Sequence, residues 1–212
     1  MLESFRTIQQ DGSHEIEIKK SRFIASLKRT QTVEEADAFI AAVKKEHKDA
    51  THNCSAYQIG EHNEFQKAND DGEPSGTAGV PMLEIFRKRE LKNVTAVVTR
   101  YFGGIKLGAG GLIRAYGGAV NDGVNALGVV ERRLLHEIRI GVDYSLSGKL
   151  EYALNESDYL LKDTQYTDKV TFICYIETEE IEDFKGKMTN LTSGQAHFEE
   201  GERAYIEIPQ DD

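Results

Sequence analysis

Three cations, Arg100, Lys106 and Arg114, stand within or beside a glycine-dense stretch near the middle of the chain. Six glycines lie between Gly103 and Gly117. Glycine loses the most backbone entropy on folding, so this density predicts a backbone shaped for close approach by another chain segment or by a ligand. A β-branched run precedes the glycines and a helical pattern follows them, which predicts a strand, a turn and a helix N-terminus. The backbone N–H groups of such a turn favour an anion.

The candidate anion or nucleic-acid site consists of the cations, the aromatic residues and the glycines of this stretch: Arg100, Tyr101, Phe102, Gly103, Gly104, Lys106, Gly108 and Arg114. The cations would bind phosphates. Tyr101 or Phe102 would stack on a base, a contact worth about 1–3 kcal/mol. Known phosphate-loop signatures do not fit, because Ala109 stands where a Walker loop has lysine and Ile113 where a dinucleotide fingerprint has its last glycine. Glycine packing alone, contact with an RNA backbone and a nucleotide pocket all stay open as interpretations.

A second polar stretch, Asp70-Asp-Gly-Glu-Pro-Ser-Gly-Thr77, carries three acids. Clustered carboxylates bind hard divalent cations, but a run of this kind is more typical of a turn with a glycine at positive φ. We therefore expect neither a metal site nor a cofactor. His52, Cys54 and Ser75 would form a nucleophile and base only if the fold brought them together. No Gly-x-Ser-x-Gly elbow surrounds Ser75, so no catalytic residue is assigned.

Composition bounds the class of protein. The 212 residues are 39% hydrophobic and 29% charged, as in ordinary soluble proteins, and they suffice for two small domains. No apolar run approaches the roughly 20 residues that span a bilayer, so no membrane partner is expected. Cys54 and Cys174 lie far apart, in neither metal-binding nor redox spacing. This predicts buried free thiols in a reducing compartment, and hence a cytoplasmic protein.

Charge is spread unevenly along the chain. Residues 1–134 carry 19 Lys and Arg against 18 Asp and Glu, whereas residues 135–212 carry 7 against 18. Such asymmetry predicts two domains, of which the first would meet any polyanion. The net charge of −10 argues against a protein that coats nucleic acid without specificity.

The expected elements form two groups, which together predict an α+β fold. The first group contains strands at 14–19, 21–27, 52–59 and 94–101, and helices from 32, 78–91 and 110–127. The second contains a strand at 134–142, a helix at 145–155, strands at 159–164 and 170–177, a helix at 180–191 and a strand at 204–208. The order of the second group, β-α-β-β-α-β, is that of a ferredoxin-like domain.

Two motifs resemble those of the YigZ/IMPACT family: Asp70–Gly79 and Val98–Tyr116. His52-Asn-Cys54 and Lys20-Ser-Arg-Phe23 also match, so the resemblance covers most of residues 1–130. It implies domains like the fourth and fifth of elongation factor G. Residues 1–132 would be an IMPACT-type domain, a four-stranded sheet with two helices on one face, and 133–212 an acidic ferredoxin-like domain. The family-motif loop would comprise Asp70, Asp71, Gly72, Glu73 and Pro74 together with His52.

The resemblance also implies a function by analogy. Translation-factor domains of this kind contact ribosomal RNA, and eukaryotic relatives regulate translation initiation through a kinase pathway that uses a further domain, which has no counterpart in this sequence. We therefore expect a non-enzymatic cytoplasmic protein that binds RNA or the ribosome and is linked to regulation of translation. The first alternative is a binder or enzyme for a small phosphorylated metabolite at the glycine loop. The second is a protein partner of the translation machinery, docked on the acidic domain.

Overall fold

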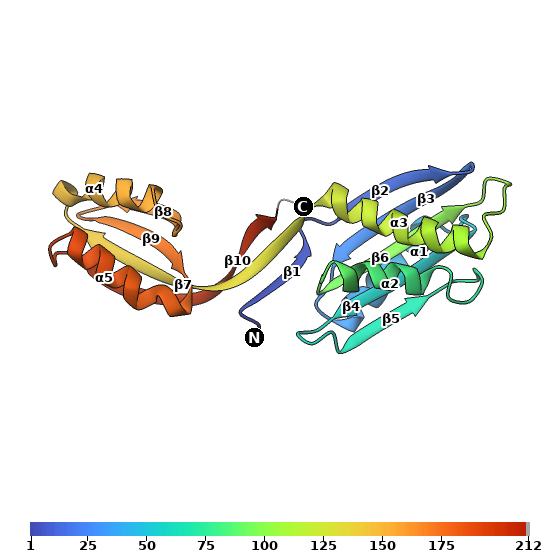
Figure 1. Ribbon diagram of the computed structural model, residues 1–212, viewed down its shortest axis with the longest axis horizontal. Helices are drawn as coiled ribbons and strands as arrows, with labels where there is room; N and C mark the ends of the chain where they lie inside the picture. Colours follow the sequence, from blue (N-terminus) through green and yellow to red (C-terminus); the bar gives the residue numbers. More distant parts are fainter. Residues whose placement is uncertain (211–212) are drawn as a thin grey trace. The chain divides into compact units, whose positions relative to one another are not determined.

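The chain, seen in a computed structural model that describes residues 1–210, divides into two compact units. Unit 1 comprises Met1–Arg132 and the chain from Glu207 onward, and unit 2 comprises Arg133–Ile206. Figure 1 shows the helices and strands of each unit. The chain leaves unit 1 after Arg132, and the described residues from Glu207 to Gln210 belong to unit 1 again.

The main sheet of unit 1 has the strand order β2-β3-β6-β4-β5. Its strands are β2 (Gly12–Ile18), β3 (Ser21–Arg29), β4 (His52–Ile59), β5 (Phe65–Asn69) and β6 (Val94–Tyr101). The sheet was expected to have four strands and has five, since no strand was predicted where β5 lies. All five residues of β5 are exposed, so its sequence carries no alternation of buried and exposed positions. A further strand, β1 (Ser4–Ile8), was also missed.

Helices cover both faces of this sheet. Figure 1 shows α2 (Gly79–Lys88) and α3 (Ala109–Leu127) over one face, as the sequence predicted. Residues from both helices and from the central strands share the main hydrophobic core, in which Phe23, Phe86 and Tyr116 are fully buried. The third helix, α1 (Val33–Glu46), packs through a separate small cluster with Tyr57 and Ile59 of β4. Because side chains alternate along a strand, these two residues lie on the face opposite the main core.

The helix α3 follows the glycine-dense stretch and anchors it to the core. Its predicted apolar stripe is buried along its whole length: Leu112, Tyr116, Val120, Val124 and Leu127. A Cβ atom at Gly123 would stand 2.8 Å from Cδ1 of Leu27 in β3. This glycine therefore lets the helix lie closer to the sheet than any other residue would allow.

Unit 2 has the predicted β-α-β-β-α-β order. Its elements are β7 (Val129–Val142), α4 (Tyr144–Asn155), β8 (Leu160–Tyr166), β9 (Val170–Ile176), α5 (Ile181–Leu191) and β10 (His197–Gln210), with a 3₁₀ turn at Thr178–Glu180. The strand order β10-β7-β9-β8 is ferredoxin-like. Both helices contribute to one core, with Leu150 from α4 and Phe184 from α5. The α+β class is thus confirmed.

Two strands run longer than the sequence predicted. Both β7 and β10 have 14 residues, and each begins in one unit and ends in the other. They pair with each other, and β1 pairs with β7. No helix in the described part of the chain has the length and apolar character needed to cross a membrane.

Candidate functional site

The family-motif loop is held in place by its own acids, beginning with Asp70. The carboxylate of Asp70 accepts hydrogen bonds from the backbone N–H groups of Gly76 at 2.8 Å, Ala78 at 3.0 Å and Gly79 at 2.9 Å. The N–H groups of Ala78 and Gly79 stand at the N-terminus of α2, so the side chain of Asp70 caps this helix although it lies several residues before it. Burial raises the pKa of Asp70, but the three backbone donors outweigh it and hold the pKa below its ordinary value.

Asp71 ties the same loop to β4 and α1. Its carboxylate accepts from the backbone N–H of Asn53 at 2.7 Å and from Nζ of Lys44 at 2.6 Å. Its carbonyl oxygen lies 2.8 Å from Nδ1 of His52. The turn passes through Gly72 at a φ of +90°, which agrees with the predicted glycine at positive φ.

Glu73 reaches into the core, where it forms a buried polar centre. Its Oε1 accepts from Nη1 of Arg100 at 2.6 Å and from the hydroxyl of Tyr116 at 2.7 Å. Its Oε2 lies 3.7 Å from Nε2 of His52. Both Glu73 and Arg100 are buried. Pro74 follows at the edge of this centre and accepts from the backbone N–H of Thr77 at 3.0 Å.

These contacts change the role expected for Arg100. The sequence placed it among the phosphate contacts, but its guanidinium is 6% exposed and bonded to an internal carboxylate. Arg100 is therefore not available to an anion at the surface, whereas Lys106 and Arg114 are exposed. The signal that would have shown this is the position of Arg100 on β6, two residues after Val98, which places it on the core face.

The side chains that a catalytic or a metal site would need are not brought together by this loop. Asp70, Asp71 and Glu73 point to different partners, and among residues 1–210 no group of three or more His, Cys, Asp or Glu side chains could hold a metal ion. Cys54 donates from Sγ to the carbonyl oxygen of Asp70 at 3.0 Å. Burial raises the pKa of the Cys54 thiol to about 12, so the reactive thiolate is not formed near neutral pH.

The glycine stretch contains glycines of two kinds. A Cβ at Gly103 would lie 2.0 Å from the backbone of Lys20, so this glycine permits the turn between β2 and β3 to approach β6. Gly108 has a φ of +71° and precedes α3, and a Cβ there, as at Gly104, would meet no neighbouring atom. The first glycine serves chain packing, whereas the later two shape an open surface.

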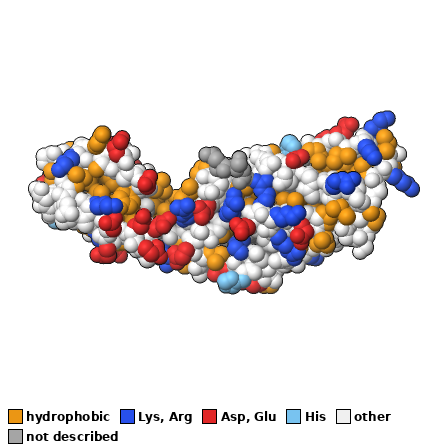
Figure 2. Space-filling view, in the orientation of Figure 1, with side chains coloured by type: hydrophobic (Ala, Val, Ile, Leu, Met, Phe, Trp, Pro, Cys, Tyr) orange, Lys and Arg blue, Asp and Glu red, His pale blue; other side chains and the backbone are white. Residues whose placement is uncertain are grey.

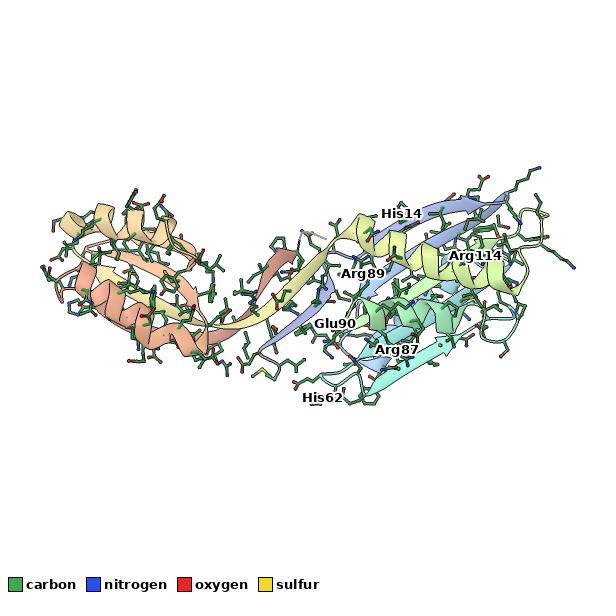
Figure 3. The ribbon with its side chains drawn as sticks, viewed as in Figure 1. His14, His62, Arg87, Arg89, Glu90 and Arg114 are labelled. Carbon is green, nitrogen blue, oxygen red and sulfur yellow. The ribbon has the colours of Figure 1, made fainter. Side chains whose placement is uncertain are left out.

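The N-terminus of α3 opens onto that surface. No side chain caps it, and its first turn contains no acidic residue. Nη1 of Arg114 lies 3.6 Å from the Cβ position of Gly110, so this guanidinium folds back over the first turn. Figure 3 shows Arg114 on α3. Helix N-termini attract anions through their exposed N–H groups and the helix dipole.

Cations gather at this end of unit 1. Lys20, Lys106 and Arg114 are exposed, and none of the three has an ion pair or hydrogen bond from its side chain to any described residue. Figure 2 shows Lys and Arg side chains projecting from the end that carries the turn between β2 and β3.

The two aromatic residues of the stretch, Tyr101 and Phe102, differ in exposure, as expected for neighbours on a strand. Tyr101 is half-buried with its hydroxyl 2.9 Å from Nδ1 of His47, and Phe102 is 46% exposed.

A cavity of about 350 Å³ lies between the glycine stretch and the family-motif loop. The residues that line it are Glu73, Pro74, Arg100, Phe102, Lys106, Leu107, Gly108, Ala109 and Leu112. Its walls are therefore mainly apolar, with a buried ion pair at its edge and one free cation. It joins the two motifs that the sequence singled out separately, and its volume falls within the range of about 300–1,000 Å³ typical of ligand sites.

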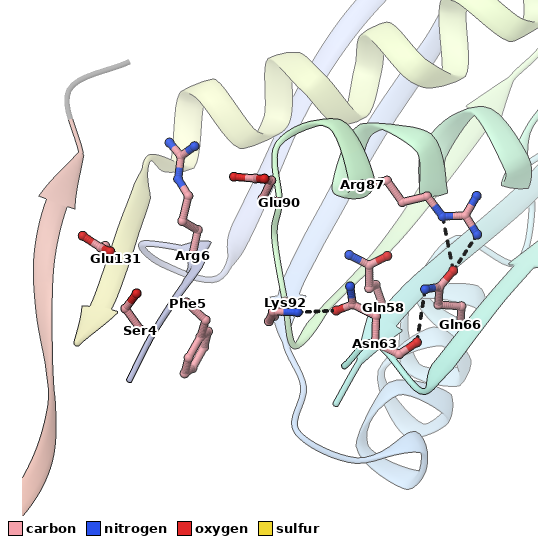
Figure 4. Close-up of a pocket in the computed structure, with 10 residues that line it drawn as sticks. All are labelled: Ser4, Phe5, Arg6, Gln58, Asn63, Gln66, Arg87, Glu90, Lys92 and Glu131. Atoms are coloured by element: carbon pink, nitrogen blue, oxygen red, sulfur yellow. Dashed lines mark hydrogen bonds between the residues drawn. The ribbon is translucent and has the colours of Figure 1, made fainter. Parts of the chain in front are cut away.

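A second cavity in unit 1, of about 500 Å³, was not predicted (Figure 4). Its lining includes two cations, Arg87 and Lys92. Arg87 bonds to Gln66 and Glu84, and Nζ of Lys92 bonds to Oδ1 of Asn63 at 3.0 Å. Neither residue lines the first cavity, so the two basic groups are separate.

A sheet with helices on both faces, followed by a ferredoxin-like unit, defines a class of α+β proteins that has known relatives. A family model described as the Impact N-terminal domain matches residues 19–124, and one described as a domain of unknown function matches residues 140–195. The chain is 56% identical to "IMPACT family member YvyE" of Bacillus subtilis over 98% of this chain and 95% of the relative. It is 38% identical to "IMPACT family member YigZ" of Escherichia coli, over 84% and 88%.

The chain therefore belongs to the IMPACT family, as its motifs indicated. A solved structure described as that of a hypothetical protein superimposes with a TM-score of 0.60 at 35% identity, covering 93% of this chain and 97% of that one. The fold class expected from the resemblance is thus shared by a solved relative.

Proposed function

We propose that this chain is a non-enzymatic RNA-binding protein that contacts the ribosome and is linked to regulation of translation. The observation that carries the proposal is the pair of free cations, Lys106 and Arg114, beside the uncapped N-terminus of α3. Cations and backbone N–H groups are the phosphate ligands of RNA-binding proteins, and phosphate contacts supply most of the affinity. Phe102 adds an exposed ring at the same place, on which a base can stack.

The link to translation rests on the family. Eukaryotic relatives act on translation initiation, and the implied fold is that of translation-factor domains that contact ribosomal RNA. By the same analogy, a protein of the translation machinery is a second partner to test against the acidic unit 2. A cytoplasmic location fits two buried cysteines that are both free thiols.

Co-sedimentation with ribosomes across a salt series tests the proposal. We expect the wild-type chain to pellet with ribosomes at low salt and to dissociate steeply as salt rises. The double variant Lys106→Ala with Arg114→Ala should lose most of this binding. A control with Lys88→Ala and Lys169→Ala removes two exposed cations elsewhere and should bind as the wild type does. Absence of binding by the wild type at low salt, or equal binding by both double variants, contradicts the proposal.

The cavity favours one alternative, a small phosphorylated metabolite bound at the glycine stretch. Its volume suits such a ligand, and Lys106 lines it. A thermal-shift panel of nucleotides and sugar phosphates separates the two functions, because a ligand at a hundredfold excess over its Kd stabilises the folded state by about 2.7 kcal/mol. A strong stabilisation by one compound, without ribosome binding, would favour the metabolite.

A further inference from the structure

The cavity between the glycine stretch and the family-motif loop has more features than phosphate binding requires. A surface that binds phosphates alone needs only cations and N–H groups, which Lys106 and the start of α3 supply at one side of the cavity. The cavity instead offers apolar walls from Leu107, Leu112 and Pro74, and an aromatic ring from Phe102. Such walls suit the flat, weakly polar surface of a nucleobase.

Phe102 is the outermost member of a fixed stack of rings and cations. The Arg100 guanidinium carbon lies 5.4 Å from the centre of the Phe102 ring and 5.4 Å from that of Phe23. Phe23 in turn meets the buried ring of Tyr116 edge-on, with centroids 5.3 Å apart. Since Glu73 holds both Arg100 and Tyr116, the support behind the exposed ring is rigid. A preorganised ring binds a base with little loss of conformational entropy.

A second, independent feature is a donor without an acceptor. Nε of Arg100 is buried and has no hydrogen-bond partner among the described residues, although the side chain lines the cavity. A buried polar group left unpaired destabilises the folded state, because it has lost its hydrogen bonds to water. Every nucleobase carries ring nitrogens or keto oxygens that accept hydrogen bonds. An acceptor held in the cavity would therefore lie beside the side chain that carries this unpaired donor.

We propose that this cavity takes one unstacked nucleobase of single-stranded RNA, packed against Phe102. Its neighbouring phosphate then lies at the N-terminus of α3, near Lys106 and Arg114. The inference rests on the proposed function and specifies what it recognises. A base within a duplex cannot enter such a cavity, whereas a base in a single strand or loop is free to leave its stack. A volume of about 350 Å³ is large enough to hold one base.

Fluorescence anisotropy with two labelled oligomers tests the inference. The first is an eight-residue RNA, and the second is an oligomer of the same length and phosphate number in which every residue is abasic. We expect the full chain to bind the abasic oligomer about tenfold more weakly, as the loss of base stacking predicts. Equal binding of the two overturns the base cavity but leaves phosphate binding intact. Binding of neither overturns the proposed function itself.

Two variants separate the cavity from the charged surface. Phe102→Ala removes the ring, and Ala109→Phe fills the cavity from the first residue of α3; both positions are exposed, so the fold should persist, as thermal unfolding can verify. Each should weaken RNA binding about tenfold and leave abasic binding unchanged. Ala126→Phe, at an exposed position near the end of the same helix, is the control and should change neither. RNA binding by both cavity variants at wild-type affinity contradicts the inference, as does a nucleoside monophosphate that binds as tightly as the oligomer.

Discussion

Two loops of unit 1 carry the family motifs, and they use their polar groups in opposite ways. In the Asp70–Gly79 loop, each acid is bonded within the protein: Asp70 to backbone N–H groups, Asp71 to Lys44, and Glu73 to Arg100. In the glycine stretch, Lys106 and Arg114 have no such partner among the described residues, and the nearby helix N-terminus is uncapped. One loop is built for stability and the other is left available for binding.

This difference shows that density of charged residues does not by itself identify a binding site. The acidic loop, expected to be a turn rather than a metal site, is a structural support. The single arginine at the end of β6 looked like a phosphate ligand and belongs to the same support. Pairing within the fold, rather than residue type, decides which groups stay available. The following predictions test the contrast.

The largest effect is expected for Glu73→Ala. Removing this carboxylate leaves the Arg100 guanidinium buried without its partner, and breaking a buried pair in this way typically destabilises a protein by about 3–5 kcal/mol. Urea denaturation followed by circular dichroism measures the change. Glu15→Ala is the matched control, because Glu15 pairs with Arg22 at the surface, where such pairs contribute about 0–1 kcal/mol. If the two variants lose similar amounts of unfolding free energy, the distinction between the buried and the exposed ion pair is wrong.

A smaller effect is expected for Asp70→Asn. The amide keeps only one acceptor oxygen, for Ala78 and Gly79, and its NH2 group cannot accept from the N–H of Gly76, so we expect a loss of about 1–2 kcal/mol near neutral pH. The pKa of Asp70 is lowered in the folded state, so its stabilisation is present above the unfolded pKa of about 3.9 and is lost as pH falls through the folded pKa. Urea titrations from pH 7 to pH 2 should thus show a weaker acid dependence in this variant. Asp122→Asn, at an exposed position on α3, should leave the pH profile unchanged.

Gly108→Ala tests whether the turn before α3 needs its backbone conformation. At a φ of +71° alanine is strained, and we expect a loss of about 1–2 kcal/mol in urea denaturation. Gly118→Ala on the same helix has open space around its Cβ position and should instead stabilise by up to about 1 kcal/mol. If both substitutions change stability in the same direction, the positive φ at Gly108 does not constrain the turn.

The smallest effect on stability belongs to Lys106→Ala with Arg114→Ala. Neither side chain has an internal partner, so thermal unfolding should change by less than about 0.5 kcal/mol. The same variant should change RNA binding most: the slope of log Kd against log salt should decrease by about 1.4, since two phosphate contacts are lost from a single strand. A large stability loss would place these cations with the structural loop instead.

Sequence reasoning predicted most of the fold because the elements that carry it are strongly periodic. The stripe on α3 and the buried strand β6 were both predicted within about one residue of their observed bounds. It failed for β5, whose five residues are all exposed, and for the first half of β10, which carries a run of charged and polar residues. Such segments form strands because their backbones pair with a neighbouring strand rather than because alternate side chains are buried. A single sequence does not reveal which strands pair.

The candidate site stays a prediction, but some of its local features could be read from the sequence. The turn before α3 and the aromatic pair Tyr101 and Phe102 followed from local pattern, whereas the pairing of side chains did not. The bond between Arg100 and Glu73 spans 27 residues, and no local signal indicates it. The cavity joins residues 73–74 to residues 100–112, so its existence depends on the sheet that brings those segments together.

The return of the chain to unit 1 has a practical consequence. Arg132, where the chain leaves that unit, and Glu207, where it comes back, lie on paired strands, with Nε and Oε1 3.6 Å apart. Glu207 also binds Arg29 of β3, which lowers the pKa of Glu207. Truncation after residue 132 would discard this carboxylate. Excision of residues 133–206, with a short linker closing the gap, would retain it and yield a minimal single-unit protein in which the glycine turn can be studied by itself.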